Sequence, residues 1–362
     1  MAELPKTWED WVANFGEWQD RVGFNREWLG DFDLSILFDW ERAGDVIEFG
    51  DYKGRAKWER ALQVPQQSMR DALIAMITVQ GDTEFASVEQ QRHGWQMAYL
   101  LMTYFGQQGR REAQKLLERN AQDGDRLLGA FNIPMPHWLD FFCYTMFVDR
   151  DGKFQLGMLS TSAFKPLAAS MGPMLKEESF HLGTGSNGLR RIIKAGVIPL
   201  DMLQRYINKW VSTAHDLFGV DASSSAHWAY VWGIKGRWDE RKKLDAGIEV
   251  NKEVLNEESR GHYHEEIVGE VRKLCGYLPE GAADLYVPHE NFNRAIGATK
   301  GQHYNVDGTP FEGSDEDYAA YLEEILPTAQ DEIDLQELFK QEWIANKPMS
   351  TRQIESGIGA SA

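Results

Sequence analysis

The most informative part of the chain is residues 136–164, PHWLDFFCYTMFVDRDGKFQLGMLSTSAF. A helix drawn through this segment is apolar on nearly every face, which is typical of a helix buried in the centre of a protein. Asp149 ends its most apolar run, FFCYTMFVD. Because a buried carboxylate is costly unless it is paired or binds a metal, Asp149 is a candidate ligand. The alternative is that Asp149 caps a helix break at residues 149–152.

A second candidate lies in KEESFHLGTG, residues 176–185. Glu178 and His181 are three positions apart, so on a helix they share one face, with Cβ atoms about 5–6 Å apart. This Glu-x-x-His pair can hold a metal and is the repeated unit of di-iron helical bundles. The chain between Asp149 and Glu178 is long enough to run to the end of one helix and back along the next. The side chains of Asp149, Glu178 and His181 can therefore meet. Alone, the motif also arises by chance, with Glu178 facing solvent.

An upstream half-site is available in GDTEFASVEQQRHGW, residues 81–95, which contains Glu84, Glu89 and His93. On one straight helix Glu84 and His93 would lie about 13 Å apart along the axis. That separation is too large for two ions less than about 4 Å apart. Glu89 and His93, four positions apart, satisfy the geometry. Gln90 stands where a second Glu-x-x-His would need a glutamate.

Helical periodicity extends well beyond these motifs. Met69, Leu73, Met76 and Ile77 lie on one helical face, and apolar helical patterns continue to about Cys275. The sequence therefore predicts a mainly all-α protein with a helical bundle over residues 66–275. Residues 1–65, which hold six of the 13 tryptophans up to position 58, predict an irregular or partly stranded extension. Residues 276–362, rich in Gly, Pro and Asp, predict a loop-rich tail packed on the bundle.

Composition narrows the class of protein. The formal charge of −18 repels phosphate backbones and anionic lipid, which disfavours nucleic-acid and membrane-surface binding. Two cysteines exclude a disulfide scaffold and a Cys-rich zinc or iron–sulfur site. The first residues, MAELPKTWEDW, contain no apolar signal region, and no run of 18 apolar residues occurs. We therefore expect a cytoplasmic protein.

A family resemblance is carried by seven segments that occur in order between about residues 49 and 308. The chain resembles the di-iron aromatic acyl-CoA epoxidases, the group of the benzoyl-CoA 2,3-epoxidase oxygenase component and the phenylacetyl-CoA epoxidase catalytic subunit. The segments are GDTEFASVEQQR, HGWQMAYLLMTYFG, FVDRDGKFQL, EESFHLGTG, MLQRYINKW, DLFGVDASSSAHWAYVWGIKGRW and VPHENFNRAIG.

The resemblance implies a ferritin-like bundle that binds two iron ions and uses O₂. It implies epoxidation of an aromatic acyl-CoA, with benzoyl-CoA as the first expectation and phenylacetyl-CoA or another aromatic acyl-CoA as the alternative. No flavin or nicotinamide motif is present in the sequence, so electrons are expected from a separate NADPH-dependent reductase. Matched residue by residue, the implied metal ligands and catalytic residues are Glu84, His93, Asp149, Glu178 and His181.

A basic group follows the Glu178 motif at Arg190, Arg191 and Lys194. These side chains are candidates to bind the phosphates of coenzyme A. The equally ordinary interpretation is that they compensate the dipole at the C-terminal end of a helix.

The chain departs from the family between Glu84 and His93. The family has a longer stretch there, which holds another glutamate, and the regions 190–196 and 241–251 also look short. We expect omitted stretches, with a break between Glu89 and Gly94, and Glu89 is then only a fallback ligand. The alternative is a naturally trimmed, metal-free structural subunit, which iron content would distinguish. Homo-oligomer formation is left open.

Overall fold

The computed structural model describes residue 13 and residues 37–86, 91–119, 121–249 and 251–339. Within these ranges the chain forms helices joined by loops, and three isolated β-bridges stand in place of any strand. The prediction of an all-α, ferritin-like bundle is confirmed. The main helices are α2 (Trp40–Ala43), α3 (Gln67–Phe85), α4 (Gln91–Tyr104), α5 (Gly106–Glu118), α6 (Trp138–Leu159), α7 (Lys165–Ala195), α8 (Leu200–Leu217), α9 (Ser224–Val231), α10 (Glu240–Asp245), α11 (Leu255–Cys275), α12 (Asp315–Ile325) and α13 (Ala329–Phe339).

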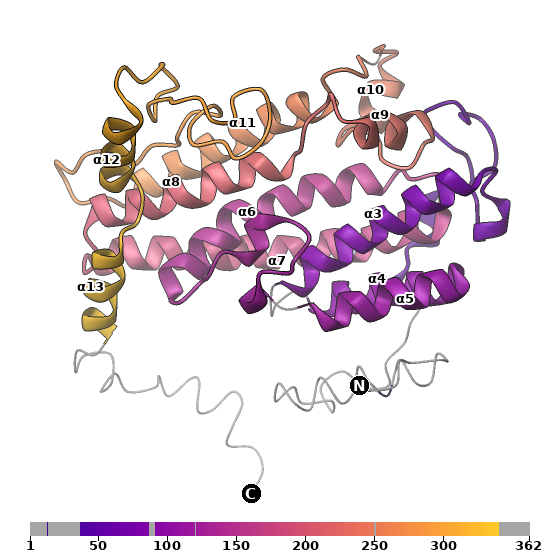
Figure 1. The fold of residues 1–362 in the computed structure, drawn as a ribbon, viewed down its shortest axis with the longest axis horizontal. Coiled ribbons are helices and arrows are strands. Elements are labelled where there is room, and N and C mark those ends of the chain that lie inside the picture. Colours follow the sequence, from indigo (N-terminus) through magenta and orange to yellow (C-terminus); the bar gives the residue numbers. More distant parts are fainter. Residues whose placement is uncertain (1–12, 14–36, 87–90, 120, 250, 340–362) are drawn as a thin grey trace, which may run out of the picture.

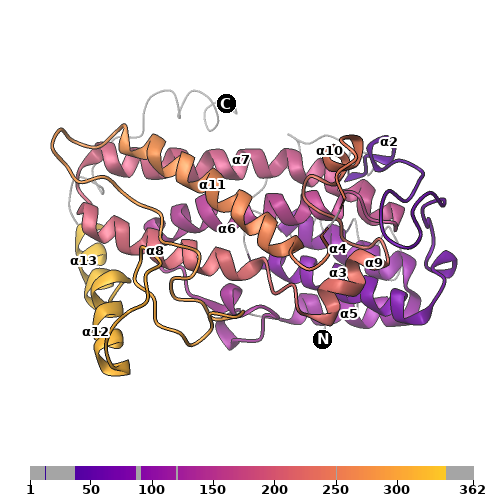
Figure 2. The ribbon, with the colours of Figure 1, turned by 90° about the horizontal axis from the view of Figure 1, so that it is seen from above.

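Two long helices, α6 and α7, form the centre of the bundle and pack along each other (Figure 1). Helix α8 packs on α6, and α11 crosses over α6 and α7 (Figure 2). Helices α3, α4 and α5 form a second group that packs together, and α4 contacts α7. The bundle therefore brings α3 and α4 against the α6–α7 pair, which carries the second half-site.

Local sequence signals set the limits of α7. Pro166 lies in its first turn, where a fixed φ and a missing N–H favour helix initiation. Gly196 ends the helix in the left-handed conformation, with φ 65°. Helix α6 continues without interruption through residues 149–152, so the interpretation of a helix break at Asp149 is wrong.

Two glycines of α7 allow it to approach α6 closely. A Cβ atom on Gly185 would lie 2.5 Å from the backbone nitrogen of Met146, and one on Gly188 would lie 2.2 Å from the ring of Phe142. Residues larger than glycine would therefore separate the two helices. From this contact, Asp149 lies three residues further along α6, and His181 lies four residues back along α7.

The segment before the bundle contains α2, a short 3₁₀ helix at Ala61–Gln63 and isolated bridges. Of the two expected forms, irregular or partly stranded, residues 37–65 take the irregular one, and the bridge between Trp58 and Phe164 ties this segment to the start of α7. Leu37, Ile47 and Trp58 are buried in the same hydrophobic cluster as α3 and α4. Tryptophans 8, 11, 18 and 28 lie outside the described residues.

The tail is less irregular than its composition suggests. It contains α12 and α13, and Leu335 of α13 is fully buried in the cluster formed by α6, α8 and α11. The expected turn at Asp307 and Gly308 is present, closed by a bridge between Tyr304 and Pro310. The division into an extension, a bundle and a tail at residues 65 and 275 stays a prediction. No helix within the described ranges is long and apolar enough to cross a membrane.

Candidate metal centre and adjoining cavity

Five side chains from four helices converge between the two halves of the bundle. They are Glu84 of α3, His93 of α4, Asp149 of α6, and Glu178 and His181 of α7. They form two groups of three, Glu84–His93–Glu178 and Asp149–Glu178–His181, with one potential ligand atom of each residue within 4.8 Å of the others. Glu178 belongs to both groups. All are buried except His181, which is half-buried.

The first group forms because α3 and α4 are separate helices. Helix α3 ends at Phe85 and α4 begins at Gln91, so the straight-helix separation of Glu84 and His93 does not arise. His93 Nδ1 lies 3.1 Å from Glu84 Oε2 and 3.6 Å from Glu178 Oε1. Helix α4 runs unbroken from Gln91 through Gly94, so no break is found in that part. Glu89 and the rest of the junction, residues 87–90, lie outside the described residues.

The imidazole of His93 is oriented by a residue that the sequence analysis missed. Its Nε2 lies 3.0 Å from Glu177 Oε2, and Glu177 also pairs with Arg92 at 2.6 Å. Burial lowers the pKa of His93, but the charge of Glu84 and hydrogen bonds to Glu177 and Glu84 outweigh it and raise that pKa to about 9. An Nε2–H that donates to Glu177 leaves Nδ1 directed at the cluster, the usual arrangement of a metal-binding histidine. The only sequence signal for Glu177 is its position next to Glu178.

Glu177 and Glu178 have opposite electrostatic environments. Burial raises the pKa of Glu177, but the hydrogen bond from His93 and the charge of Arg92 outweigh it, so that pKa is lowered to about 2. Burial, reinforced by the charge of Glu84, raises the pKa of Glu178 despite the interaction with His181, whose Nδ1 lies 3.6 Å from Glu178 Oε2. Buried carboxylates this close repel one another unless a cation lies between them.

The donor set fits a pair of iron ions. Three carboxylates and two imidazoles, with no thiolate, suit iron or another first-row divalent metal rather than a soft metal. The two groups of three share one carboxylate, Glu178, which would help to hold both ions. Glu84 and His93 complete one group, and Asp149 and His181 complete the other.

Two further polar residues adjoin the cluster. Gln80 Nε2 donates to Glu84 Oε1 at 2.5 Å and lies one helical turn before it on α3. Tyr144 is buried, and its hydroxyl has no hydrogen-bond partner among the described residues. Burial, reinforced by the charges of Asp149 and Glu84, raises the pKa of Tyr144 well above its usual value, so the phenol stays protonated. Nothing in the sequence distinguished Tyr144 from the other aromatic residues of this apolar helix.

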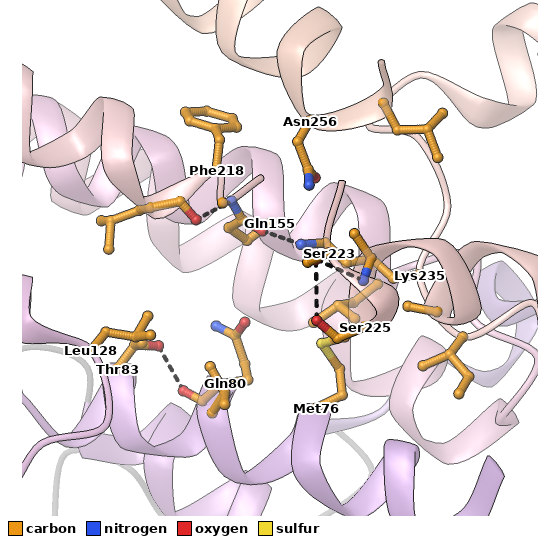
Figure 3. A pocket seen from close by; sticks show the side chains of 18 of the residues that line it. Met76, Gln80, Thr83, Leu128, Gln155, Phe218, Ser223, Ser225, Lys235 and Asn256 are labelled. Carbon is orange, nitrogen blue, oxygen red and sulfur yellow. Dashed lines mark hydrogen bonds between the residues drawn. The ribbon is translucent and has the colours of Figure 1, made fainter. Parts of the chain in front are cut away.

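A cavity of about 490 Å³ opens beside the cluster and is lined by Glu84, Asp149 and Tyr144 at that end. Its walls come from α3, from α6, from the loop between α5 and α6, and from residues 217–236, which include α9. Figure 3 shows Gln80 and Leu128 on one side of the cavity and Gln155 and Lys235 on the other. The apolar residues of the wall include Met76, Val79, Leu128, Phe131, Val148, Leu159 and Phe218.

The basic group of α7 lies elsewhere. Arg190 and Lys194 are positioned over the ring of Tyr277, with the guanidinium carbon of Arg190 5.8 Å and Lys194 Nζ 4.7 Å from its centroid. Arg191 is exposed on the same end of the helix. None of the three lines the cavity. Their role in coenzyme A binding stays a prediction. The cationic side chains that line the cavity belong to other residues.

Comparisons with known proteins agree with this geometry. The sequence model of the family described as phenylacetic acid catabolic protein matches residues 78–284, which include all five converging side chains. The chain is 31% identical to benzoyl-CoA oxygenase component B of Aromatoleum evansii, over 91% of this chain and 88% of the relative. The alignment spans 421 positions, more than the 362 residues of this chain, so the relative contains segments with no counterpart here. Whether one of these segments falls between Glu89 and Gly94 stays a prediction. The protein belongs to the phenylacetic acid catabolic protein family.

Proposed function

We propose that this protein is the oxygenase component of an aromatic acyl-CoA epoxidase, with benzoyl-CoA as substrate and the 2,3-epoxide as product. The observation that carries the proposal is the pair of ligand groups that share Glu178 at the end of an apolar cavity. The similarity to a protein named benzoyl-CoA oxygenase component B supports the choice of substrate.

The five candidate ligands would hold two iron ions between them. Glu84, His93 and Glu178 would hold one iron ion, and Asp149, Glu178 and His181 the other. Iron bound there would supply the reductive activation of O₂ that an inert aromatic ring requires and that no side chain provides.

The cavity walls would seat the ring and exclude water from it. Apolar side chains of α3 and α6, such as Val79 and Val148, face a volume large enough for an aroyl group and part of its thioester arm. Tyr144 lines this volume, and its protonated hydroxyl holds a proton near Asp149 and Glu84. A phenol in this position can donate a hydrogen bond to an oxygen atom between the cluster and the ring.

Electrons would come from a second protein. One atom of O₂ enters the ring and the other leaves as water, so each turnover consumes two electrons and two protons. We propose a separate NADPH-dependent reductase as their source, and the term "component" in the relative's name supports a multicomponent system.

The test is anaerobic loading with ferrous iron followed by turnover. We expect about two iron ions per chain. With reductase, NADPH and O₂, we expect benzoyl-CoA to gain one oxygen atom, detected by mass spectrometry with ¹⁸O₂. Phenylacetyl-CoA is the second candidate because of the family's description, and greater turnover of it in the same assay would replace the first. A chain that binds no iron would instead support a metal-free structural subunit.

A further inference from the structure

The cavity is also lined by a lysine whose hydrogen-bonding capacity is mostly unused. Lys235 Nζ donates to Gln155 Oε1 at 2.6 Å and forms no ion pair with any described residue (Figure 3). Gln155 is fixed in turn, because its Nε2 donates to Asp151 Oδ1 at 2.9 Å and to the Leu217 carbonyl at 3.4 Å. Lys235 is therefore a positioned cation that lines the cavity.

An ammonium group in this position favours a ligand with an oxygen acceptor. Lysine has three N–H donors, and Gln155 accepts from only one of them. Burial lowers the pKa of Lys235, while the charges of Asp151 and Asp221 oppose this effect. A purely apolar ligand would remove water from the remaining donors without replacing its hydrogen bonds, which is unfavourable. An oxygen atom of the ligand would restore them.

The position of Lys235 indicates which oxygen atom of the ligand accepts its hydrogen bond. Its partner Gln155 lies six residues after Asp149 on α6, about 9 Å along the helix axis. In an aroyl thioester the carbonyl oxygen lies within about 5 Å of every ring carbon, given bond lengths of about 1.2–1.5 Å. The phosphates of coenzyme A lie beyond the whole pantetheine arm. With the ring beside Glu84 and Asp149, the carbonyl oxygen is the acceptor that reaches Lys235.

We propose that Lys235, held by Gln155, is the substrate-binding residue that donates a hydrogen bond to the carbonyl oxygen of the aroyl thioester. This inference rests on the proposed function. It adds to that function the residue that recognises the carbonyl group of the substrate. Because conjugation keeps the ring close to the plane of the carbonyl group, fixing the carbonyl group also orients the ring. The Lys235 contact therefore determines which ring edge faces the cluster.

The experiment compares two ligands on two proteins. Iron-loaded protein without O₂ or reductase is titrated calorimetrically with benzoyl-CoA and with S-benzyl-CoA, in which CH₂ replaces the carbonyl group. Wild-type protein should prefer benzoyl-CoA by about 10-fold or more, the usual value of a hydrogen bond to a charged donor. Lys235→Met, which keeps the length of the side chain, should lose this preference. Lys273→Met removes a charge at the exposed Lys273 on α11 and should keep it.

The outcomes separate the two proposals. If Lys235→Met keeps the wild-type preference for benzoyl-CoA, the role of Lys235 is overturned while the proposed function stands. If wild-type protein binds neither ligand nor any other aromatic acyl-CoA, the proposed function fails and this inference fails with it. If Lys235→Met does not fold, Lys235→Gln provides the same test, because it removes the charge and keeps a donor, and its preference should be smaller than that of wild type. An unchanged preference in Lys235→Gln would then count against the proposal.

Discussion

Single side chains are not equivalent within the candidate metal centre. Glu178 belongs to both groups of three, whereas Asp149 and His181 belong to one group and Glu84 and His93 to the other. A change at position 178 removes a potential ligand from both groups at once. A change at any of the other four positions leaves one group complete.

The first prediction tests this asymmetry. Glu178→Gln keeps the volume of the side chain, so the fold should persist, but both iron ions should be lost and ring oxygenation should fall below detection. His181→Gln should reduce iron chiefly at one position. Iron content and circular dichroism of the two variants provide the measurement. Full iron content and normal turnover in Glu178→Gln would contradict the assignment.

The second prediction concerns Glu177, which orients His93. Glu177→Ala removes the acceptor for His93 Nε2 and should weaken iron binding about 10- to 100-fold, the usual effect of losing such a partner. Glu177→Gln keeps an acceptor oxygen and should recover part of the affinity. Competition with a coloured chelator measures both values. Glu316→Gln, at an exposed position of α12, is the control. Equal affinities for Glu177→Ala and wild type would refute the orienting role.

Sequence spacing identified some of these residues and missed others. Glu178 and His181 were recognisable because both lie on one turn of one helix. Glu177, Tyr144 and Lys235 were not, because their roles depend on contacts with α4, with the cluster and with the cavity, which lie far away along the chain. Local periodicity carries no information on such contacts.

Helices α6 and α7 determine the distance between Asp149 and the Glu178–His181 pair. Their close approach depends on Gly185, where any Cβ would meet the backbone of Met146. The glycine at position 183, two residues closer to His181, has open space around it. The two positions provide a matched pair of substitutions on one helix.

The third prediction uses that pair. Gly185→Ala should lower the free energy of unfolding by about 1–3 kcal/mol, because backbone must move to admit the methyl group. It should also weaken iron binding, since α6 and α7 carry Asp149, Glu178 and His181. Gly183→Ala should raise the free energy of unfolding by roughly 0.5–1 kcal/mol, because alanine favours the helix. Urea unfolding of the two metal-free variants measures both changes in the free energy of unfolding. A Gly185→Ala variant as stable as Gly183→Ala would argue against close packing there.

At the scale of elements, the sequence predicted which segments are helical better than how they pair. The apolar pattern of residues 136–164 and the proline at 166 gave α6 and the start of α7. The same pattern could not show that the chain reverses between α3 and α4, because VEQQRH contains no proline or glycine to indicate a turn. It also missed α12 and α13, whose acidic sequences resemble loops until Leu335 is seen to be buried.

Among the described residues, most buried apolar side chains fall in two large hydrophobic clusters, one built mainly around α3, α4 and α5 and the other around α6, α8 and α11. The five candidate ligands come from helices of both sides. Metal ions at this site would therefore link the two halves of the bundle. Without them, the carboxylates of Glu84, Asp149 and Glu178 repel one another within the core.

The fourth prediction follows from this link. Ferrous iron should raise the melting temperature, because a ligand that binds only the folded state stabilises it, by about 2.7 kcal/mol at a concentration of 100 Kd. Anaerobic thermal unfolding with and without iron provides the measurement. Glu178→Gln should show little of this increase. A melting temperature that iron leaves unchanged in wild-type protein would contradict the link.

The sharing of Glu178 also limits how this protein can evolve. Two independent sites can diverge separately, because one retains its function while the other accumulates mutations. Here a mutation at position 178 damages both ligand groups in a single step. No descendant can abandon one group through this residue and inherit the other intact. The two ligand groups are therefore kept or lost together whenever residue 178 changes.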